Sequence, residues 1–192
     1  MRILFYDLET TGLSRNYNEI LNIAAIVYND ETDSIEGEFN RYIKPKEAIS
    51  WNITRLTGIT NEMVKNCSNE GLTLYEFTEW VRHQNCSAVA GHNIIMFDIP
   101  WIDTKCKKYT IENTLPSYVI DTLPMAKEAY AAGTLPGYNY TTEKGNLSFK
   151  QEYLMNYWDL GTQEHLALSD VQYDIQIYKK LKECLENQDY GF

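Results

Sequence analysis

The first part of the chain carries three segments whose hydrophobic patterns are typical of strands. Residues 3–6 and 20–28 are continuous apolar runs, the second rich in Ile, Ala and Val, and both are typical of buried strands. Residues 34–43 alternate loosely between apolar and polar positions, and the polar segment from Tyr28 to Asp33 has the composition of a hairpin turn. These patterns predict a meander of three strands.

Helical patterns follow the meander. Residues 60–63 resemble a helix start, and Thr73 followed by Glu76 fits a capping box, which predicts a helix over residues 74–83. The most regular pattern lies in residues 164–185, where apolar residues recur every three or four positions and predict an amphipathic helix.

Two short apolar segments between these helices are predicted strands. Residues 88–90 end at a glycine and lead to a predicted helix over 97–107, with Pro100 in its first turn. Residues 119–122 have the pattern of a strand end that enters another helix. A meander followed by alternating strands and helices predicts an α/β fold with a mixed sheet. Without repeats or a linker, we expect one domain over residues 1–186 and a short tail at 187–192.

The composition of the chain disfavours several classes of protein. The chain has 192 residues and a net charge of −10, which argues against a broad electrostatic grip on duplex DNA. Any phosphate chemistry would need bound cations. The spacing of the four cysteines fits no zinc or redox motif, so we interpret them as reduced packing thiols. With no run approaching the ~20 apolar residues of a membrane span and no signal-peptide pattern, we expect a cytoplasmic or nuclear protein, neither secreted nor membrane-bound.

Acidic residues follow the predicted strands. Asp7 and Glu9 come at the end of the first strand, where alternation in an extended chain directs both to one side. Carboxylates at strand ends of an α/β sheet lie where ligands usually bind. Asp98 begins a predicted helix, and Asp170 follows His165 by five positions near the start of the last one. For each residue a plain alternative stays open: a solvated strand end for Asp7 and Glu9, a favourable charge at a helix start for Asp98, and a surface histidine for His165.

Four carboxylates of this kind could hold two Mg²⁺ or Mn²⁺ ions, because hard cations prefer oxygen ligands. Their charges would balance (−4 + 4 = 0). Two such ions could support phosphodiester cleavage. His165, with an ordinary pKa near 6.5, is suited to removing a proton from water near neutral pH.

Three segments together resemble the motifs of a known family. They are FYDLETTGLS at residues 5–14, the Asn93 to Asp98 segment, and HLALSDV at residues 165–171. Their order and separation resemble the DEDDh branch of the DnaQ-like 3′–5′ exonucleases. Residues 56–60 and 119–123 resemble two further segments of that family, so the similarity covers roughly residues 2–181. The sister branch has tyrosine four positions before the last aspartate, where this chain has Leu166.

The resemblance implies an RNase H-like fold, with a five-stranded mixed sheet of a three-stranded meander and two parallel strands, flanked by helices. It implies release of nucleoside 5′-monophosphates from the free 3′ end of single-stranded DNA or RNA, with Asp7, Glu9, Asp98 and Asp170 as metal ligands and His165 as the base. It also implies a set of substrate contacts. These are Leu8, Thr10, Thr11, Leu13, His92, Asn93 and Phe97. For Leu13 and Phe97, ordinary core packing is the alternative.

The segment 130–145 departs most from the family pattern. It is predicted to be a long loop whose tyrosines either lie at the surface or stack on bases of a single strand. Several lysines are candidate phosphate contacts, with a solvated lysine face as the alternative. They are Lys105, Lys107, Lys108, Lys144 and Lys150.

Three functions are compatible with these patterns. We favour a free-standing exonuclease. The second is a proofreading or trimming subunit that acts within a polymerase or other nucleic-acid-processing complex, and the third is an inactive fold that only binds nucleic acid. The third is disfavoured because all five catalytic residue types are present. Homodimer formation and the choice between DNA and RNA stay open.

Overall fold

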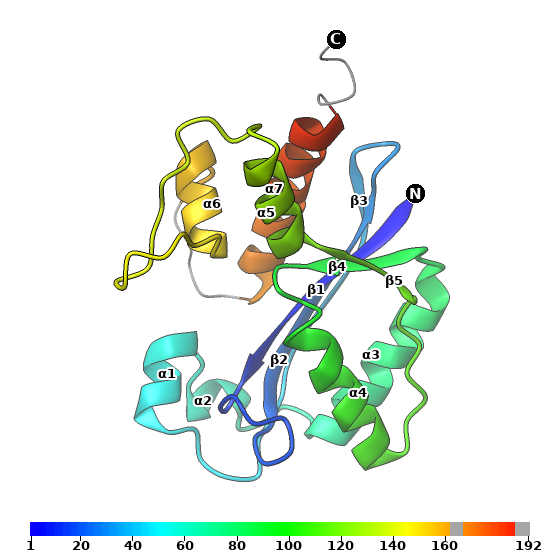
Figure 1. Ribbon diagram of the computed structural model, residues 1–192. Helices are drawn as coiled ribbons and strands as arrows, with labels where there is room; N and C mark the ends of the chain where they lie inside the picture. The colour runs from blue at the N-terminus through cyan, green and yellow to red at the C-terminus, as the bar shows by residue number, and fades with distance from the viewer. Residues whose placement is uncertain (162–166, 187–192) are drawn as a thin grey trace.

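The computed structural model describes residues 1–161 and 167–186, which form a mixed five-stranded sheet flanked by helices (Figure 1). The sheet order is β3-β2-β1-β4-β5. The strands are β1 (Arg2–Thr10), β2 (Ile20–Asn29), β3 (Ser34–Tyr42), β4 (Ala88–Gly91) and β5 (Tyr118–Asp121). The first three pair antiparallel, whereas β1, β4 and β5 run parallel. The predicted fold class is confirmed.

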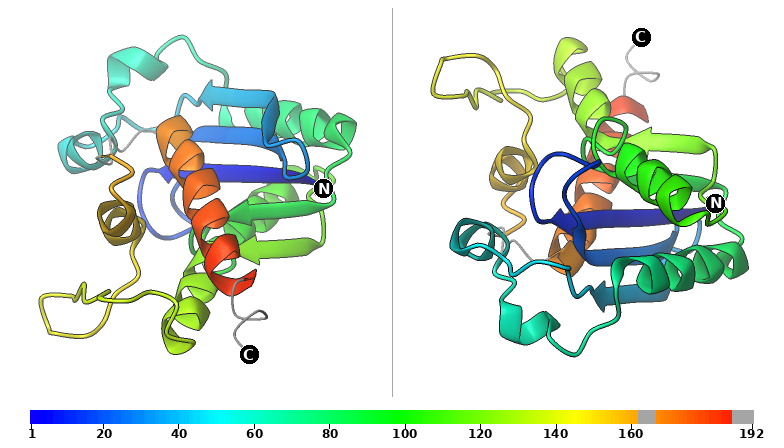
Figure 2. Two further views of the ribbon diagram at one scale, coloured as in Figure 1. Left: turned by 90° about the horizontal axis from the view of Figure 1, so that it is seen from above. Right: turned by 90° about the horizontal axis from the view of Figure 1, so that it is seen from below.

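The alternating side chains of β1 face two different helical layers. Leu4 and Tyr6 pack with Phe77 and Trp101, which come from the helices α3 (Glu70–Gln84) and α4 (Asp98–Tyr109). Ile3 and Phe5 pack instead against α7 (Ala167–Glu186) on the opposite face. Figure 2 shows α7 across one face of the sheet and α3 and α4 across the other. Period-two alternation therefore fixes which side of the sheet each later residue of β1 faces.

Most predicted helices are present, with shifted starts. The helix predicted at 74–83 begins at Glu70, because Asn69 is the N-cap and accepts a hydrogen bond from Leu72 N at 3.0 Å. The capping box at Thr73 was therefore wrong, and Thr73 is a buried residue inside α3. Thr60 caps α2 (Asn61–Val64) as predicted. The start of the last predicted helix, 164–166, lies outside the described residues.

Two helices were not predicted from the sequence. They are α1 (Trp51–Thr57) and α6 (Gln151–Trp158), whereas α5 (Thr122–Ala131) follows β5 as predicted. Helix α6 packs with α5 and α7 around a third cluster that includes Tyr138. Tyr138 is 4% exposed, and its ring stacks on Phe149 with centroids 5.1 Å apart. Both the surface position and base stacking were therefore wrong for Tyr138, whose buried ring packs the 130–150 segment against the helices.

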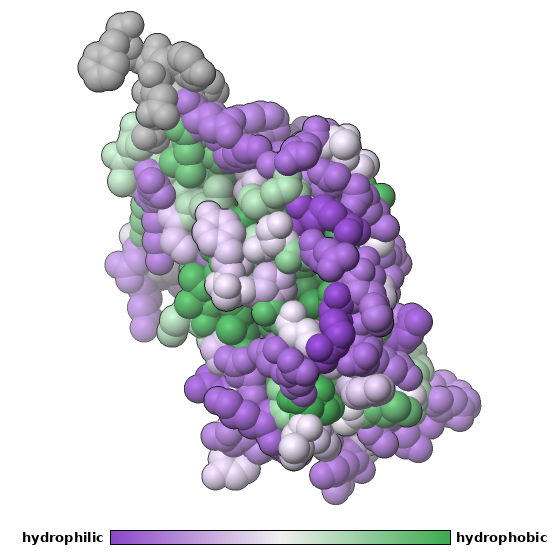
Figure 3. Space-filling model, turned by 90° about the vertical axis from the view of Figure 1, so that its right-hand side faces the viewer, coloured by the Kyte–Doolittle hydropathy of each residue, from purple (hydrophilic) through white to green (hydrophobic). Residues whose placement is uncertain are grey.

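The outer surface agrees with the polar composition. Figure 3 shows hydrophilic residues over most of one side of the molecule, with smaller hydrophobic areas between them. All four cysteines are free thiols. Among residues 1–161 and 167–186, no helix has both the length and the apolar character that a membrane crossing requires.

Candidate active site

The site lies where β1 ends, on the α7 side of the sheet. Because Ile3 and Phe5 face α7, the same alternation turns Asp7 and Glu9 toward this helix, while Leu8 faces the other core. Strand β1 continues to Thr10, beyond the apolar run that predicted it. Both carboxylates are therefore held by a regular strand in the middle of the sheet.

Helix α7 brings a third carboxylate to this position. Asp170 lies in its first turn, immediately before Val171, which packs against the sheet. One carboxylate oxygen from each of Asp7, Glu9 and Asp170 lies within 4.8 Å of the other two. The helix and the strand thus assemble three acids that are far apart in the sequence.

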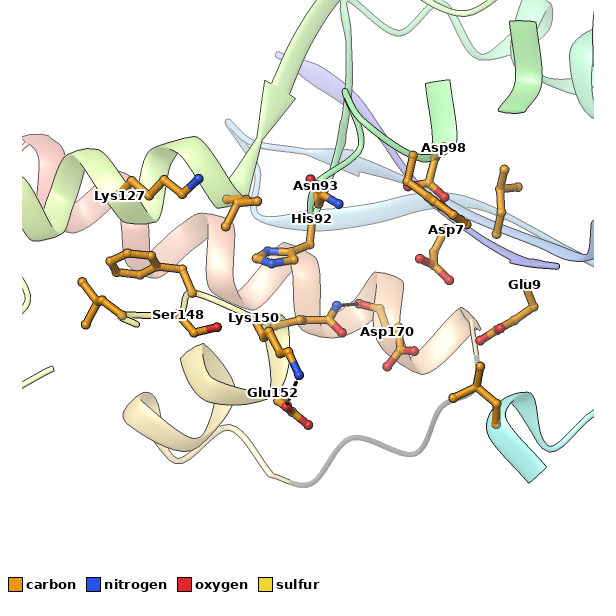
Figure 4. Close-up of a pocket in the computed structure, with 17 residues that line it drawn as sticks. Asp7, Glu9, His92, Asn93, Asp98, Lys127, Ser148, Lys150, Glu152 and Asp170 are labelled. Atoms are coloured by element: carbon orange, nitrogen blue, oxygen red, sulfur yellow. Dashed lines mark hydrogen bonds and ion pairs between the residues drawn. The ribbon is translucent and has the colours of Figure 1, made fainter. Parts of the chain in front are cut away.

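Asp98 lies on the other side of Asp7, at the first residue of α4 (Figure 4). It lines the same cavity but does not belong to the group of three whose oxygens lie within 4.8 Å. Its side chain is buried, and no described residue forms a hydrogen bond with its Oδ1 atom. His165, the predicted base, lies outside the described residues.

Burial and mutual repulsion shift the titration of these acids. Burial, together with the charge of Asp170, raises the pKa of Asp7 to about 7. Burial and the charges of Asp7 and Asp170 raise the pKa of Glu9 to about 9. The pKa of Asp98 is raised well above its ordinary value, mainly by burial and then by Asp7. Each shift reflects negative charge that has lost water without gaining an equivalent positive partner.

The donor set fits a divalent cation. Carboxylate oxygens are the ligands that Mg²⁺ and Mn²⁺ prefer, and a cation among Asp7, Glu9 and Asp170 would remove the repulsion that raises their pKa values. The buried Oδ1 atom of Asp98 is a further oxygen that lacks a hydrogen-bond donor among the described residues. The residues therefore suit such ions chemically.

Two buried aspartates that sequence reasoning missed hold the segment between β4 and α4. Asp121 accepts hydrogen bonds from Asn93 N at 2.8 Å and Ile95 N at 3.1 Å, and it also caps α5. Asp174 accepts one from His92 N at 3.1 Å. The strand end at Asp121 was visible in the sequence, but its bonds to a segment 28 residues earlier had no local signal.

Asp174 also connects α7 to the opposite wall of the cavity. Gln151, the first residue of α6, donates to Asp174 Oδ1 at 2.8 Å and to the backbone oxygen of Asp170 at 3.0 Å. Burial raises the pKa of Asp174 well above its ordinary value. Through Gln151, the turn of α7 that carries Asp170 is tied directly to the start of α6.

The predicted substrate contacts divide into two groups. Four of them line the cavity with the carboxylates; these are Leu8, His92, Asn93 and Phe97. His92 Nδ1 lies 2.9 Å from Thr122 Oγ1, and burial lowers the pKa of His92 to about 4, so its ring is neutral at physiological pH. Phe97 contacts both the cavity and the core, where its ring lies 5.9 Å from that of Trp101.

The other three predicted contacts lie outside the cavity lining. Thr10 donates to Gly12 O at 2.8 Å, and Thr11 Oγ1 accepts from Glu19 N at 2.9 Å, so both hydroxyls stabilise the loop after β1. Leu13 is 88% exposed at this loop, so core packing was the wrong alternative for it.

The wall opposite the carboxylates comes from α5 and from the segment leading into α6. Lys127, Ser148 and Lys150 line the same cavity of about 660 Å³, a volume typical of ligand sites (Figure 4). Of the candidate phosphate contacts, Lys150 lies on this wall, whereas Lys105 is fully buried and paired with Glu70 at 3.1 Å. The prediction for Lys105 was therefore wrong, because a buried acid contacts its ammonium group.

Comparison with known proteins shows the family of the chain. The exonuclease family model matches residues 4–178. The chain is 29% identical over 197 residues to the PolC-type DNA polymerase III of Pediococcus pentosaceus, and 31% identical over 177 residues to that of Staphylococcus aureus. These matches cover 98% and 92% of this chain but only 13% and 11% of the relatives, so the chain spans about an eighth of their length.

Solved structures show the same fold. E. coli exonuclease I in complex with a dT13 oligonucleotide has a TM-score of 0.82 and 22% identity, covering 98% of this chain and 43% of that one. Exonuclease I of Methylocaldum szegediense has a TM-score of 0.79 and 21% identity, covering 95% and 40%. With a family model matching most of its length, this chain belongs to the DnaQ-like 3′–5′ exonuclease family of the RNase H-like superfamily.

Proposed function

We propose that this chain is a metal-dependent 3′–5′ exonuclease that releases nucleoside 5′-monophosphates from the 3′ end of single-stranded DNA or RNA. The observation that carries the proposal is the gathering of Asp7, Glu9 and Asp170 within 4.8 Å, with buried Asp98 beside them. In a chain with a net charge of −10, such a cluster has little structural value unless cations bind to it. The proposed exonuclease domain covers residues 1–186.

In this proposal the four carboxylates hold two divalent cations, Mg²⁺ or Mn²⁺. When bound, the two ions supply a nucleophile at neutral pH and stabilise the negative charge that develops on the leaving oxygen. The strand β1 and the helix α7 orient Asp7, Glu9 and Asp170 before substrate arrives, since regular elements fix all three backbones. This preorganisation reduces the reorganisation needed in the transition state.

His165 is proposed to take the proton of the attacking water. It precedes the described start of α7 by two residues, and Asp170 lies in the first turn of that helix. A base of ordinary imidazole pKa is matched to this task near neutral pH.

The terminal nucleotide is proposed to lie against Leu8, His92, Asn93 and Phe97, which line the cavity beside the carboxylates. Asn93 has a left-handed backbone with φ of 61°, and Asp121 holds its N–H. We propose that its side-chain amide contacts the sugar or the phosphate. Thr10, at the end of β1, and Thr11 and Leu13, in the loop that follows, are proposed to act from beside the cavity.

A second candidate function is proofreading or trimming within a polymerase or another nucleic-acid-processing complex. Its support is the similarity to PolC-type DNA polymerases, which extends over 92–98% of this chain. A partner would then deliver the 3′ end to the same site. The exonuclease I complex with dT13 supports single-stranded DNA as one substrate class.

The test is a time course with matched 5′-labelled single strands of DNA and RNA, with Mg²⁺ or Mn²⁺ and with EDTA as the control. The proposal predicts a ladder that shortens from the 3′ end only when metal is present, and the relative rates identify the preferred strand. Cleavage in EDTA, or cleavage at internal positions, would contradict it. Activity only after addition of a polymerase would favour the second candidate.

A further inference from the structure

The cavity that holds the carboxylates has a second end with the opposite charge. Lys127 comes from α5 and Lys150 from the N-cap position of α6, and both line the same cavity as Asp7 and Asp170. Figure 4 shows Lys127 extending toward His92, while Lys150 lies near Glu152 on the lower wall. The cavity is therefore acidic at the sheet and basic at the wall formed by α5 and α6.

The lysines differ in how strongly they are already paired. Lys150 Nζ lies 3.5 Å from Glu152 Oε1, a distance at which an exposed pair contributes little. Lys127 is exposed and has no ion pair within 4.0 Å in the described part of the chain. Both ammonium groups are thus available to an anion at low cost, unlike Lys105, whose charge is committed to Glu70.

The space between the two ends is neutral and partly apolar. The ring of His92 lies there (Figure 4), and Leu123 and Phe149 add apolar surface to the cavity lining. His92 is held in place by Thr122 and, through its backbone, by Asp174. A neutral zone between an acidic and a basic end suits a sugar and a base, with a phosphate at each end.

We propose that Lys127 and Lys150 form a second phosphate subsite, which binds one internucleotide phosphate of the strand whose terminal linkage lies at the carboxylates. This inference rests on the proposed function, because it places the substrate strand in that cavity. Ser148 adds a hydroxyl on the same wall. Glu152 competes with the phosphate for Lys150, so it weakens the subsite.

The subsite also has a defined relation to the catalytic end. Gln151, next to Lys150 in the chain, bonds to Asp174 and to the backbone of Asp170. The lysine wall and the turn carrying Asp170 are therefore connected through one side chain. This connection ties the backbone next to Lys150 to the turn that carries Asp170.

The first test compares Lys127→Met and Lys150→Met with Lys180→Met, which removes the same charge from an exposed position of α7 outside the cavity lining. The assay uses the strand that the wild type degrades. The KM of each of the first two variants should be roughly 5- to 20-fold higher than that of the wild type, as expected for the loss of one partly screened charged hydrogen bond. kcat should stay unchanged, since the contact exists in both ground and transition states. Glu152→Gln should lower KM. Equal KM values for Lys127→Met, Lys150→Met and Lys180→Met would overturn the subsite.

The second test identifies the phosphate. Oligonucleotides carry one neutral methylphosphonate linkage at the second, third or fourth position from the 3′ end. For the wild type, the neutral linkage at one of these positions should raise KM. For the Lys127→Met/Lys150→Met double variant, that modified strand and the unmodified strand should have the same KM. A linkage effect of the same size in both proteins would contradict the assignment.

The same variants separate failure of this inference from failure of the proposed function. If the wild type degrades neither DNA nor RNA, the exonuclease proposal fails, and oligonucleotide binding is then measured by fluorescence anisotropy with Ca²⁺ present. Weaker binding by the double variant than by Lys180→Met would still support the subsite, with a salt slope reduced by about 0.7 per lost contact. Equal binding would overturn it.

Discussion

Glu70 and Asp98 are both buried carboxylates at helix starts, but their surroundings are opposite. Glu70 accepts hydrogen bonds from Ile20 N at 2.9 Å and Tyr109 Oη at 2.8 Å, and it pairs with Lys105 and Lys108. Burial alone would raise its pKa, yet these donors lower it below the ordinary value.

Asp98 lies instead beside other acids, and the charge of Asp7 adds to the effect of its burial. No lysine or arginine among the described residues lies within salt-bridge distance of Asp7, Glu9 or Asp98, and the pKa of each is raised. A buried carboxylate thus stabilises the fold where the chain supplies cationic partners. Where the chain supplies none, the charge is left for a ligand to balance. The following predictions test this difference.

Asp7→Ala should have the largest effect. It should remove metal-supported exonuclease activity, while the free energy of unfolding of the metal-free protein should rise because one repelling charge is lost. Labelled-strand assays and urea unfolding in EDTA measure the two effects. Asp103→Ala, which removes an acid from α4 outside the cavity lining, is the control. A metal-free Asp7→Ala protein that is less stable than wild type would contradict the repulsion model.

His165→Ala should reduce turnover by roughly 10²- to 10⁴-fold, the usual contribution of general-base catalysis. Metal binding should be largely retained, because the carboxylates are intact. The shift in melting temperature on adding Mn²⁺ measures that binding, and His83→Ala on the exposed side of α3 is the control. A near-normal rate would rule out His165 as the base.

Lys105→Met should destabilise the protein by about 3 kcal/mol, because it leaves buried Glu70 with one cation fewer. Lys107→Met, on the exposed side of the same helix, should change the free energy of unfolding by less than about 0.5 kcal/mol. Urea unfolding compares the two. If Lys105→Met left the free energy of unfolding unchanged, the pairing of Glu70 with Lys105 would not stabilise the fold.

The last prediction concerns pH. Asp7 titrates at about 7 and Glu9 at about 9 in the folded protein, against 3.8 and 4.5 ordinarily. Between about pH 4 and pH 9 the folded state therefore binds more protons than the unfolded state, so the free energy of unfolding should fall as pH rises. Adding Mg²⁺ at 100 times its Kd should raise the free energy of unfolding by about 2.7 kcal/mol. Unfolding curves at pH 5.5 and 8.5, with Mg²⁺ or EDTA, measure both; a metal-free protein more stable at pH 8.5 would contradict the pKa shifts.

The sheet and the acids could be predicted because their signals are local. Alternation in β1 separates Phe5 from Tyr6 and carries through to Asp7 and Glu9. Helices α1 and α6 were missed since they have only 7 and 8 residues, and short helices depend on tertiary contacts more than on their own sequence.

The supporting residues were missed for a related reason. Asp174 binds the backbone of His92, 82 positions earlier, and Glu70 determines the role of Lys105, 35 positions later. In the sequence Asp174 is one polar residue of an amphipathic helix, and Lys105 is one of several lysines in α4. Only the packing of distant segments distinguishes them from solvated side chains.

The order in which the chain is synthesised determines when the carboxylate cluster can form. Asp7 is synthesised before Asp170, which lies 163 positions later in the first turn of α7. Because synthesis proceeds from the N-terminus, β1, β2 and β4 can pair before Asp170 exists. A growing chain therefore carries an incomplete carboxylate set until Asp170 is synthesised, and any hydrolysis that needs the full set is delayed until α7 docks on the sheet.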